Sequence, residues 1–92
     1  MTTVSTRVRQ ITVREGFAIT VTSSSTGRKV GPKKHGVLAK YPFVRRASDR
    51  WKVSKWIARF EETYPGHTCR VESANGNRMS GNALLEAVRA TY

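Results

Sequence analysis

The sequence Ser-Asp-Arg-Trp-Lys-Val-Ser-Lys-Trp-Ile-Ala-Arg-Phe-Glu-Glu-Thr-Tyr, at residues 48–64, carries the most regular hydrophobic pattern in the chain. Its large apolar residues fall at i, i+3, i+4, i+7 and i+11, which places them on one face of an α-helix: Val53, Trp56, Ile57, Phe60 and Tyr64. We therefore predict a helix over Asp49–Tyr64 whose apolar face is buried. Ser48 or Asp49 is expected to cap its first turn, and Pro65-Gly66 to end it.

A second stripe of this helix is cationic and consists of Lys52, Lys55 and Arg59. It lies away from the apolar face, so these side chains are expected to face solvent. Trp51 is also off the apolar face and close to Lys55. An exposed tryptophan beside cations can stack on a nucleic-acid base. The alternative is that it packs against the aromatic residues that precede the helix.

Length and composition indicate one small basic domain over residues 1–92, with a net charge of +11. The charge is uneven, because residues 1–60 hold 14 Lys or Arg and two acids, whereas residues 61–92 hold three Arg and four Glu. A cationic field confined to one part of a domain attracts polyanions. The alternative is a solvated basic surface that serves solubility.

The sequence predicts a cytoplasmic protein. No apolar run approaches the roughly 20 residues of a membrane span, and the N-terminal segment lacks the apolar core of a signal peptide. The lone Cys69 cannot form an internal disulfide, which agrees with a reducing compartment.

Residues 4–22 alternate apolar and polar side chains and are rich in β-branched residues, which predicts a β-hairpin. A three-residue loop at Arg14-Glu15-Gly16, with glycine in the αL conformation, gathers the apolar residues on one face of the sheet. Those residues are Ile11, Val13, Phe17, Ile19 and Val21. Val8 breaks the alternation, which suggests a bulge near Arg9-Gln10 or an edge that leaves the sheet.

Residues 22–36 contain three glycines, a proline and a run of hydroxyl residues, so they are expected to form a flexible loop. The loop is basic through Arg28, Lys29, Lys33 and Lys34. It is either an arm that orders on a phosphate backbone or an ordinary surface loop.

Residues 37–47 form an apolar connector that ends in Arg45 and Arg46, just before the predicted helix. Cations are unfavourable at a helix N-terminus, so their presence suggests an anion bound there.

The chain after the helix continues as a strand over His67–Ser73, a turn at Asn75-Gly76 and a short returning segment over Asn77–Ser80. A final helix is expected over Ala83–Thr91, capped by Ser80 or Asn82.

The predicted fold class is α+β. A small antiparallel sheet of three to four strands packs on one main α-helix, with a short C-terminal helix, in the order ββαβ(β)α. The expected core is Ile11, Val13, Phe17, Ile19, Val21, Val53, Trp56, Ile57, Phe60, Cys69, Val71, Leu84, Leu85 and Val88.

The residue pattern does not favour an enzyme. It offers no nucleophile–base pair, no carboxylate pair on a shared face and no glycine-rich phosphate loop. His67 and Cys69 project to one face of their strand, but even with His35 they fall short of a tetrahedral metal site. No cofactor is expected.

These patterns predict a non-catalytic nucleic-acid-binding protein, with DNA favoured over RNA. Arginine forks suit phosphates and guanine edges better than an ammonium group does. The predicted contacts are Arg28, Lys29, Lys33, Lys34, Arg45, Arg46, Trp51, Lys52, Lys55 and Arg59. Reversing Lys33, Lys34 and Lys52 to Glu is expected to weaken binding and preserve the fold.

Two other functions use the same charges. The protein can be a small basic accessory or inhibitor protein, such as a phage encodes, that binds an acidic protein partner. It can also be a subunit of a ribonucleoprotein. The sequence leaves the oligomeric state open.

Overall fold

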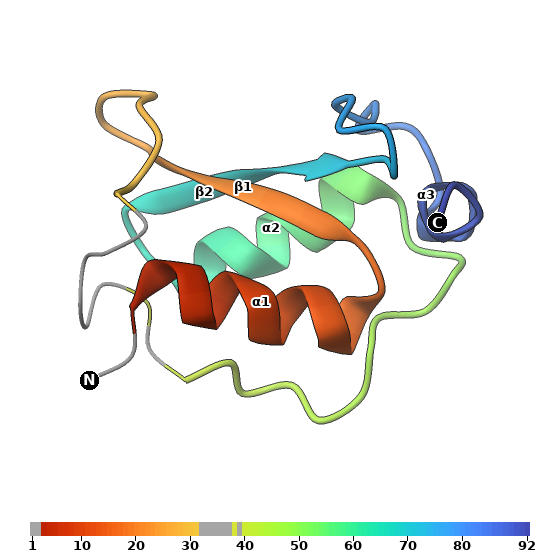
Figure 1. The fold of residues 1–92 in the computed structure, drawn as a ribbon, viewed down its shortest axis with the longest axis horizontal. Coiled ribbons are helices and arrows are strands. Elements are labelled where there is room, and N and C mark those ends of the chain that lie inside the picture. Colours follow the sequence, from red (N-terminus) through yellow and green to blue (C-terminus); the bar gives the residue numbers. More distant parts are fainter. Residues whose placement is uncertain (1–2, 32–37, 39) are drawn as a thin grey trace.

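The computed structural model of this protein describes residues 3–31, 38 and 40–92. The elements in chain order are α1 (Val4–Glu15), β1 (Ala18–Ser23), α2 (Val53–Thr63), β2 (His67–Glu72) and α3 (Leu85–Arg89). Figure 1 shows α1 and α2 running in opposite directions along the same side of the two strands, with α3 at one end. The fold is therefore a small α+β structure of two layers.

The prediction of a strand over the first half of the expected hairpin is wrong, because residues 4–15 form helix α1. Ile11 is fully buried whereas Val13 is 80% exposed, so the two side chains do not share a face. Val4, Val8, Ile11 and Glu15 lie at i, i+4, i+7 and i+11, and this helical stripe faces the core. The β-branched residues favoured a strand by propensity, but burial of this stripe decides the conformation.

Gly16 ends α1 and does not close a hairpin turn. Its φ of 84° is left-handed, and its N–H donates to the Thr12 carbonyl at 2.8 Å. The glycine was expected in the αL conformation, and it has that conformation as a helix C-cap. Thr3 caps the other end, where its side chain accepts a hydrogen bond from the Thr6 N–H at 3.2 Å.

The sheet within the described residues has two antiparallel strands, so the prediction of three to four strands in the order ββαβ(β)α is also wrong. The first predicted strand is α1, and the other candidate segments add only single bridges, Thr22 to Lys29 and Glu72 to Arg78. The observed order is αβαβα. Ile19 pairs with Val71 and Val21 with Cys69, so one face of the sheet is apolar and meets the helices.

The main helix begins later than predicted, at Val53, and neither Ser48 nor Asp49 caps it. Lys52 is the N-cap and provides no side-chain hydrogen bond. The first N–H groups of α2 donate instead to carbonyls of the segment before α3, Val53 to Ala83 at 2.8 Å and Ser54 to Gly81 at 3.0 Å. The helix ends next to Pro65-Gly66, as the sequence predicts.

The later turns follow the sequence closely. The Asn75-Gly76 turn is confirmed by a Gly76 φ of 81° and a bond from the Gly76 N–H to the Ser73 carbonyl at 2.9 Å.

Helix α3 is shorter than expected, and neither Ser80 nor Asn82 caps it. Leu84 is its N-cap and is 40% exposed, so its placement in the core is wrong.

The core joins both helices to the sheet through a line of aromatic rings. Phe17 meets Trp56 edge-on at 5.1 Å between ring centroids, and Phe60 lies 5.9 Å from Trp56 and 5.0 Å from Tyr64. Apart from Val13, Leu84 and the partly buried Ile57, the predicted core residues are buried. The structure adds Val4, Leu38, Ala47 and Tyr64.

Candidate nucleic-acid interface

Glu15, the last residue of α1, is completely buried. It anchors the loop before α2, residues 40–52, which carries several predicted contact residues. Its carboxylate accepts hydrogen bonds from the Tyr41 hydroxyl and, at 2.8 Å, from the Ala47 N–H. Arg59 and Arg89 each form an ion pair with it, at 3.1 and 3.2 Å. Two cations and two further donors therefore satisfy one buried carboxylate.

Arg89 of α3 extends this network to the backbone. Its Nε donates to the Glu15 carbonyl at 2.7 Å, and its Nη1 donates to the Ala47 carbonyl at 2.8 Å and to Asp49 Oδ1 at 2.6 Å. Asp49 is thus part of an ion pair and not a helix cap. The end of α1, the loop before α2 and α3 are held in one arrangement, which fixes where the loop cations lie.

Tyr41 acts as a donor in this network and stays protonated. Burial of the ring, followed by its hydrogen bond to Glu15, raises the pKa of Tyr41 well above the usual range. Arg59 Nη2 donates to the same hydroxyl at 3.0 Å. The phenol therefore links a carboxylate to a guanidinium on the inner wall of the loop.

A ladder of cations and aromatic rings leads from this network to the outer side of α2. The Arg59 guanidinium lies 3.7 Å from the Phe43 ring centroid and 4.9 Å from that of Trp51. The Lys55 ammonium lies 4.4 Å from the Trp51 centroid. All three cation–ring distances are within cation–π range, so the rings hold the cations in place. We call Phe43, Arg59, Trp51 and Lys55 the cation–aromatic ladder.

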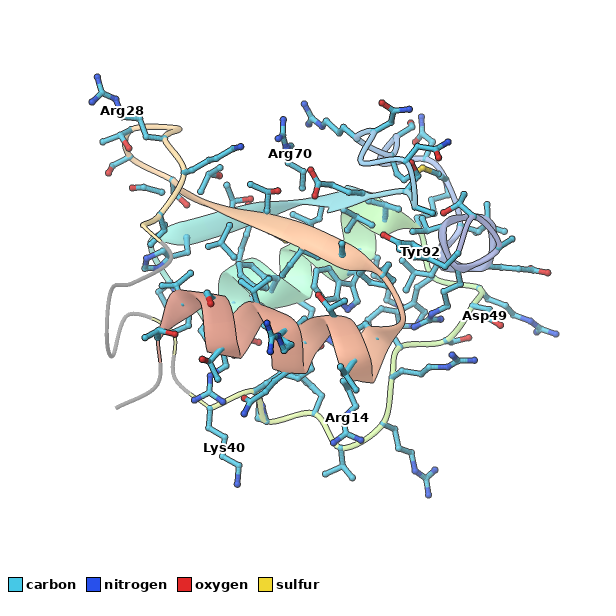
Figure 2. The ribbon with its side chains drawn as sticks, viewed as in Figure 1. Arg14, Arg28, Lys40, Asp49, Arg70 and Tyr92 are labelled. Atoms are coloured by element: carbon cyan, nitrogen blue, oxygen red, sulfur yellow. The ribbon has the colours of Figure 1, made fainter. Side chains whose placement is uncertain are left out.

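A groove of about 800 Å³ lies between the same loop and α1. Its lining residues are Arg7, Arg9, Gln10, Val13, Arg14, Lys40, Tyr41 and Phe43. It thus has four cations and no acid among the described residues that line it. Figure 2 shows Arg14 and Lys40 along the same lower edge of the molecule. We call this surface the α1 groove.

The α1 groove and the ladder share Phe43, so they form neighbouring parts of one surface. The sequence reasoning missed the groove because residues 4–15 were assigned to a strand. On a helix, Arg7, Gln10 and Arg14 lie at i, i+3 and i+7 and form one stripe. That spacing is visible in the sequence once the helix is recognised.

The predicted contact residues occupy different parts of the structure. Arg45, Arg46, Lys52 and Lys55 are exposed around the loop and the start of α2, while Trp51 is half-buried in the ladder. Arg59 is bound to Glu15, and its side chain is only 19% exposed. It therefore orders the surface from inside and offers little contact area of its own.

Arg28 and Lys29 are exposed on the turn after β1. In Figure 2 Arg28 lies at the upper left of the molecule, on the edge opposite the lower edge that carries Arg14 and Lys40. The turn is closed by bonds from Gly27 to the Ser23 carbonyl at 2.8 Å and from Val30 to the Val21 carbonyl at 3.1 Å. Lys33, Lys34 and His35 lie outside the described residues.

The remaining chemistry is limited in the described part of the chain. No group of three or more His, Cys, Asp or Glu is positioned there to hold a metal ion. Burial raises the pKa of the Cys69 thiol well above its usual range, so the thiol stays protonated and unreactive. None of the described helices combines the length and apolar character needed to cross a membrane.

Comparisons with protein families, with curated proteins and with solved structures found no match to this chain.

Proposed function

We propose that this protein binds nucleic acid without catalysing a reaction, with DNA favoured over RNA. The observation that supports this most directly is the surface formed by the α1 groove and the cation–aromatic ladder. Cations from α1, the loop and α2 meet there on a rigid support. A fixed group of cations pays less ordering entropy on binding phosphates than free side chains do.

The distribution of acids supports the same proposal. All six acids of the chain lie in the described residues, and their ion pairs there engage Arg59, Arg70 and Arg89. Glu15 is buried inside the fold, so its negative charge does not offset the positive charge of the surface. The exposed cations of α1 and the loop therefore keep a net positive field that attracts a polyanion.

The arrangement of the ladder favours phosphate contacts over base stacking. Both Lys55 and Arg59 already lie against the Trp51 ring, and Trp51 is half-buried, so little of the ring is free for a base to stack on. Single-strand binding relies on free aromatic faces. Contacts to the phosphates of a duplex require no access to the Trp51 ring, so a duplex is favoured over a single strand.

The dimensions of the protein define the probe. Its longest extent is 32 Å, which corresponds to about ten base pairs at 3.4 Å per step. A duplex of about twenty base pairs is therefore long enough to reach both Arg28 and the α1 groove in any register.

The test is a binding titration at low and at physiological salt with duplex DNA, single-stranded DNA and duplex RNA of equal length. Duplex DNA is expected to bind most tightly. The double variant Arg9→Glu with Lys40→Glu should weaken binding at least about tenfold, because each change places an acid on the exposed rim of the groove. Arg78→Glu is the matched control, since Arg78 is an exposed cation outside the groove and the ladder.

The proposal fails if none of these nucleic acids binds at low salt. It also fails if Arg78→Glu weakens binding as much as a single Lys40→Glu change, because the contact would then follow net charge and not this surface. An acidic protein partner that remains bound after nuclease treatment, combined with no nucleic-acid binding, would support the accessory-protein alternative.

A further inference from the structure

Arg7, at the base of the α1 groove, is a buried cation without an anionic partner. Arg7 is only 9% exposed, and its Nη1 donates a hydrogen bond to Gln10 Oε1. Its Nε is buried and has no hydrogen-bond partner among the described residues. All six acids of the chain are described, and none forms an ion pair with Arg7.

A buried guanidinium normally has a carboxylate or other anion beside it, because removing its charge from water is costly. The contrast within this protein is direct, since the other two largely buried arginines, Arg59 and Arg89, both pair with Glu15. Arg7 faces the groove, whereas Arg59 and Arg89 face a carboxylate. The missing counter-charge is therefore expected to come from a ligand in the groove.

The rest of the groove adds charge on its rim and apolar surface on its walls. Arg9, Arg14 and Lys40 are exposed there, and no acid is found among the described lining residues. Val13 is 80% exposed, and Tyr41 and Phe43 are half-buried. An exposed valine beside two aromatic rings is a surface for a flat apolar group, whereas four cations are a surface for a phosphate.

The size of the groove limits the ligand to a small molecule or a single unit of a polymer. A volume of about 800 Å³ falls within the range of about 300–1,000 Å³ that is usual for small-molecule sites. A nucleotide combines a phosphate with a planar ring in a molecule of this size. The Asp and Glu side chains of an acidic peptide supply the charge but no flat ring to cover Val13 and Phe43.

We propose that the α1 groove binds a nucleotide. Arg7, Arg9 and Lys40 contact the phosphate, and the base lies against Val13 and the edges of Tyr41 and Phe43. Gln10 uses its oxygen to accept from Arg7, so its amide N–H₂ remains to donate to an acceptor on the base. This site goes beyond the proposed nucleic-acid binding, because it requires no polymer.

The test is a titration of the full chain, labelled with ¹⁵N, with AMP, adenosine and inorganic phosphate at up to millimolar concentration. AMP is expected to shift the amide signals of Arg9, Gln10, Val13 and Lys40 in a saturable way. It should bind at least about tenfold more tightly than adenosine or phosphate alone, because each of those lacks one of the two contacts.

Two variants and a control give the test a structural basis. Val13→Glu places a carboxylate on the exposed wall without touching the core, so it should reduce AMP affinity at least about tenfold in a folded protein. Arg7→Gln should have a similar effect if the variant folds, and Val13→Glu decides the question if it does not. Arg78→Glu places a carboxylate on the exposed surface outside the groove and should leave AMP affinity unchanged.

The outcomes separate this site from the proposed function. Saturable AMP binding without duplex binding supports the groove and contradicts the nucleic-acid proposal, whereas duplex binding without AMP shifts does the reverse. The inference is overturned if inorganic phosphate binds as tightly as AMP, because the ring contact is then absent. It is also overturned if Val13→Glu and Arg78→Glu bind AMP equally.

Discussion

At the scale of single residues, the structure depends most on Glu15. Its carboxylate is completely buried and accepts hydrogen bonds from two arginines and a tyrosine. The sequence placed it in a hairpin turn, where glutamate is unremarkable. The difference arises because its four partners come from positions 26 to 74 residues away, and no local pattern identifies them.

Replacing Glu15 with Gln is expected to destabilise the protein by about 3 kcal/mol, because the change removes the counter-charge of two largely buried guanidinium groups while keeping the side-chain shape. The measurement is the free energy of unfolding from urea denaturation. Glu62→Gln is the matched control, since Glu62 is exposed on α2 and its loss should change stability by less than about 0.5 kcal/mol. Equal effects of the two changes would show that the Glu15 network contributes little.

Stability is expected to fall in alkaline solution because of Cys69. Burial raises the pKa of this thiol, so above pH 9.0, its ordinary value, the unfolded chain releases the proton and the folded chain keeps it. The folded state is then disfavoured, by about 1 kcal/mol between pH 8 and pH 10 from this group. Burial also raises the pKa values of Tyr41 and Tyr64, which act in the same direction.

The measurement is the free energy of unfolding at pH 8 and at pH 10 for the natural protein and for Cys69→Val. The variant lacks the thiol, so it should lose less stability over this interval. An identical loss in both proteins would exclude Cys69 as a cause of the alkaline effect.

At the scale of elements, α1 determines both the sheet and the candidate site. As a strand it would add a third member to the sheet and put Ile11 and Val13 together on the core face. As a helix it buries Ile11, exposes Val13 and aligns Arg7, Gln10 and Arg14 along the groove. The predicted fold order and the omission of the groove therefore have the same origin.

Paired alanine substitutions distinguish the two conformations of this segment. Ile11→Ala should cost about 2–5 kcal/mol, because the side chain is completely buried. Val13→Ala should change stability by less than about 0.5 kcal/mol, because the side chain is exposed. The measurement is urea denaturation of both variants, and comparable losses from the two changes would contradict helix α1.

At the scale of the whole molecule, the binding surface is expected to lie where unpaired cations remain exposed after folding. The net charge of +11 does not specify a surface. Folding places Arg59 and Arg89 inside against Glu15, and it leaves Arg9, Arg14 and Lys40 on one exposed side of α1 and the loop. Arg28, on the opposite edge of the molecule, can join the same contact only through a ligand that spans the molecule.

Binding to duplex DNA is therefore expected to depend steeply on salt, with each neutralised phosphate contributing about −0.9 to the slope of log K against log salt. Lys40→Glu should lower the magnitude of this slope by about 1, because one phosphate contact is lost. Arg78→Glu should leave the slope unchanged. The measurement is a fluorescence-anisotropy titration at four salt concentrations, and a slope that Lys40→Glu leaves unchanged would place Lys40 outside the interface.

Several features were predictable because they depend on neighbours in the chain. The helical stripe from Val53 to Tyr64, the strand that begins at His67 and the turn at Gly76 follow from spacing, β-propensity and glycine geometry. In the candidate site, Lys52 and Lys55 were correctly placed in solvent. The solvent exposure predicted for Arg59 was wrong, because its partner lies 44 residues away.

The amino-acid sequence by itself determined the amphipathic helix α2 and the apolar face of β1 and β2, since these depend on periods of 3.6 and two residues. It also determined the strong positive charge, which depends on composition alone. The tertiary structure alone decided that residues 4–15 are a helix. It also decided that Arg59 and Arg89 form ion pairs with Glu15 and do not face solvent, and that Arg7 lines a cavity without a counter-charge. The physical reason is that β-branched residues permit both conformations locally. The choice is made by burial against segments distant in the chain and by the cost of leaving a buried charge unpaired.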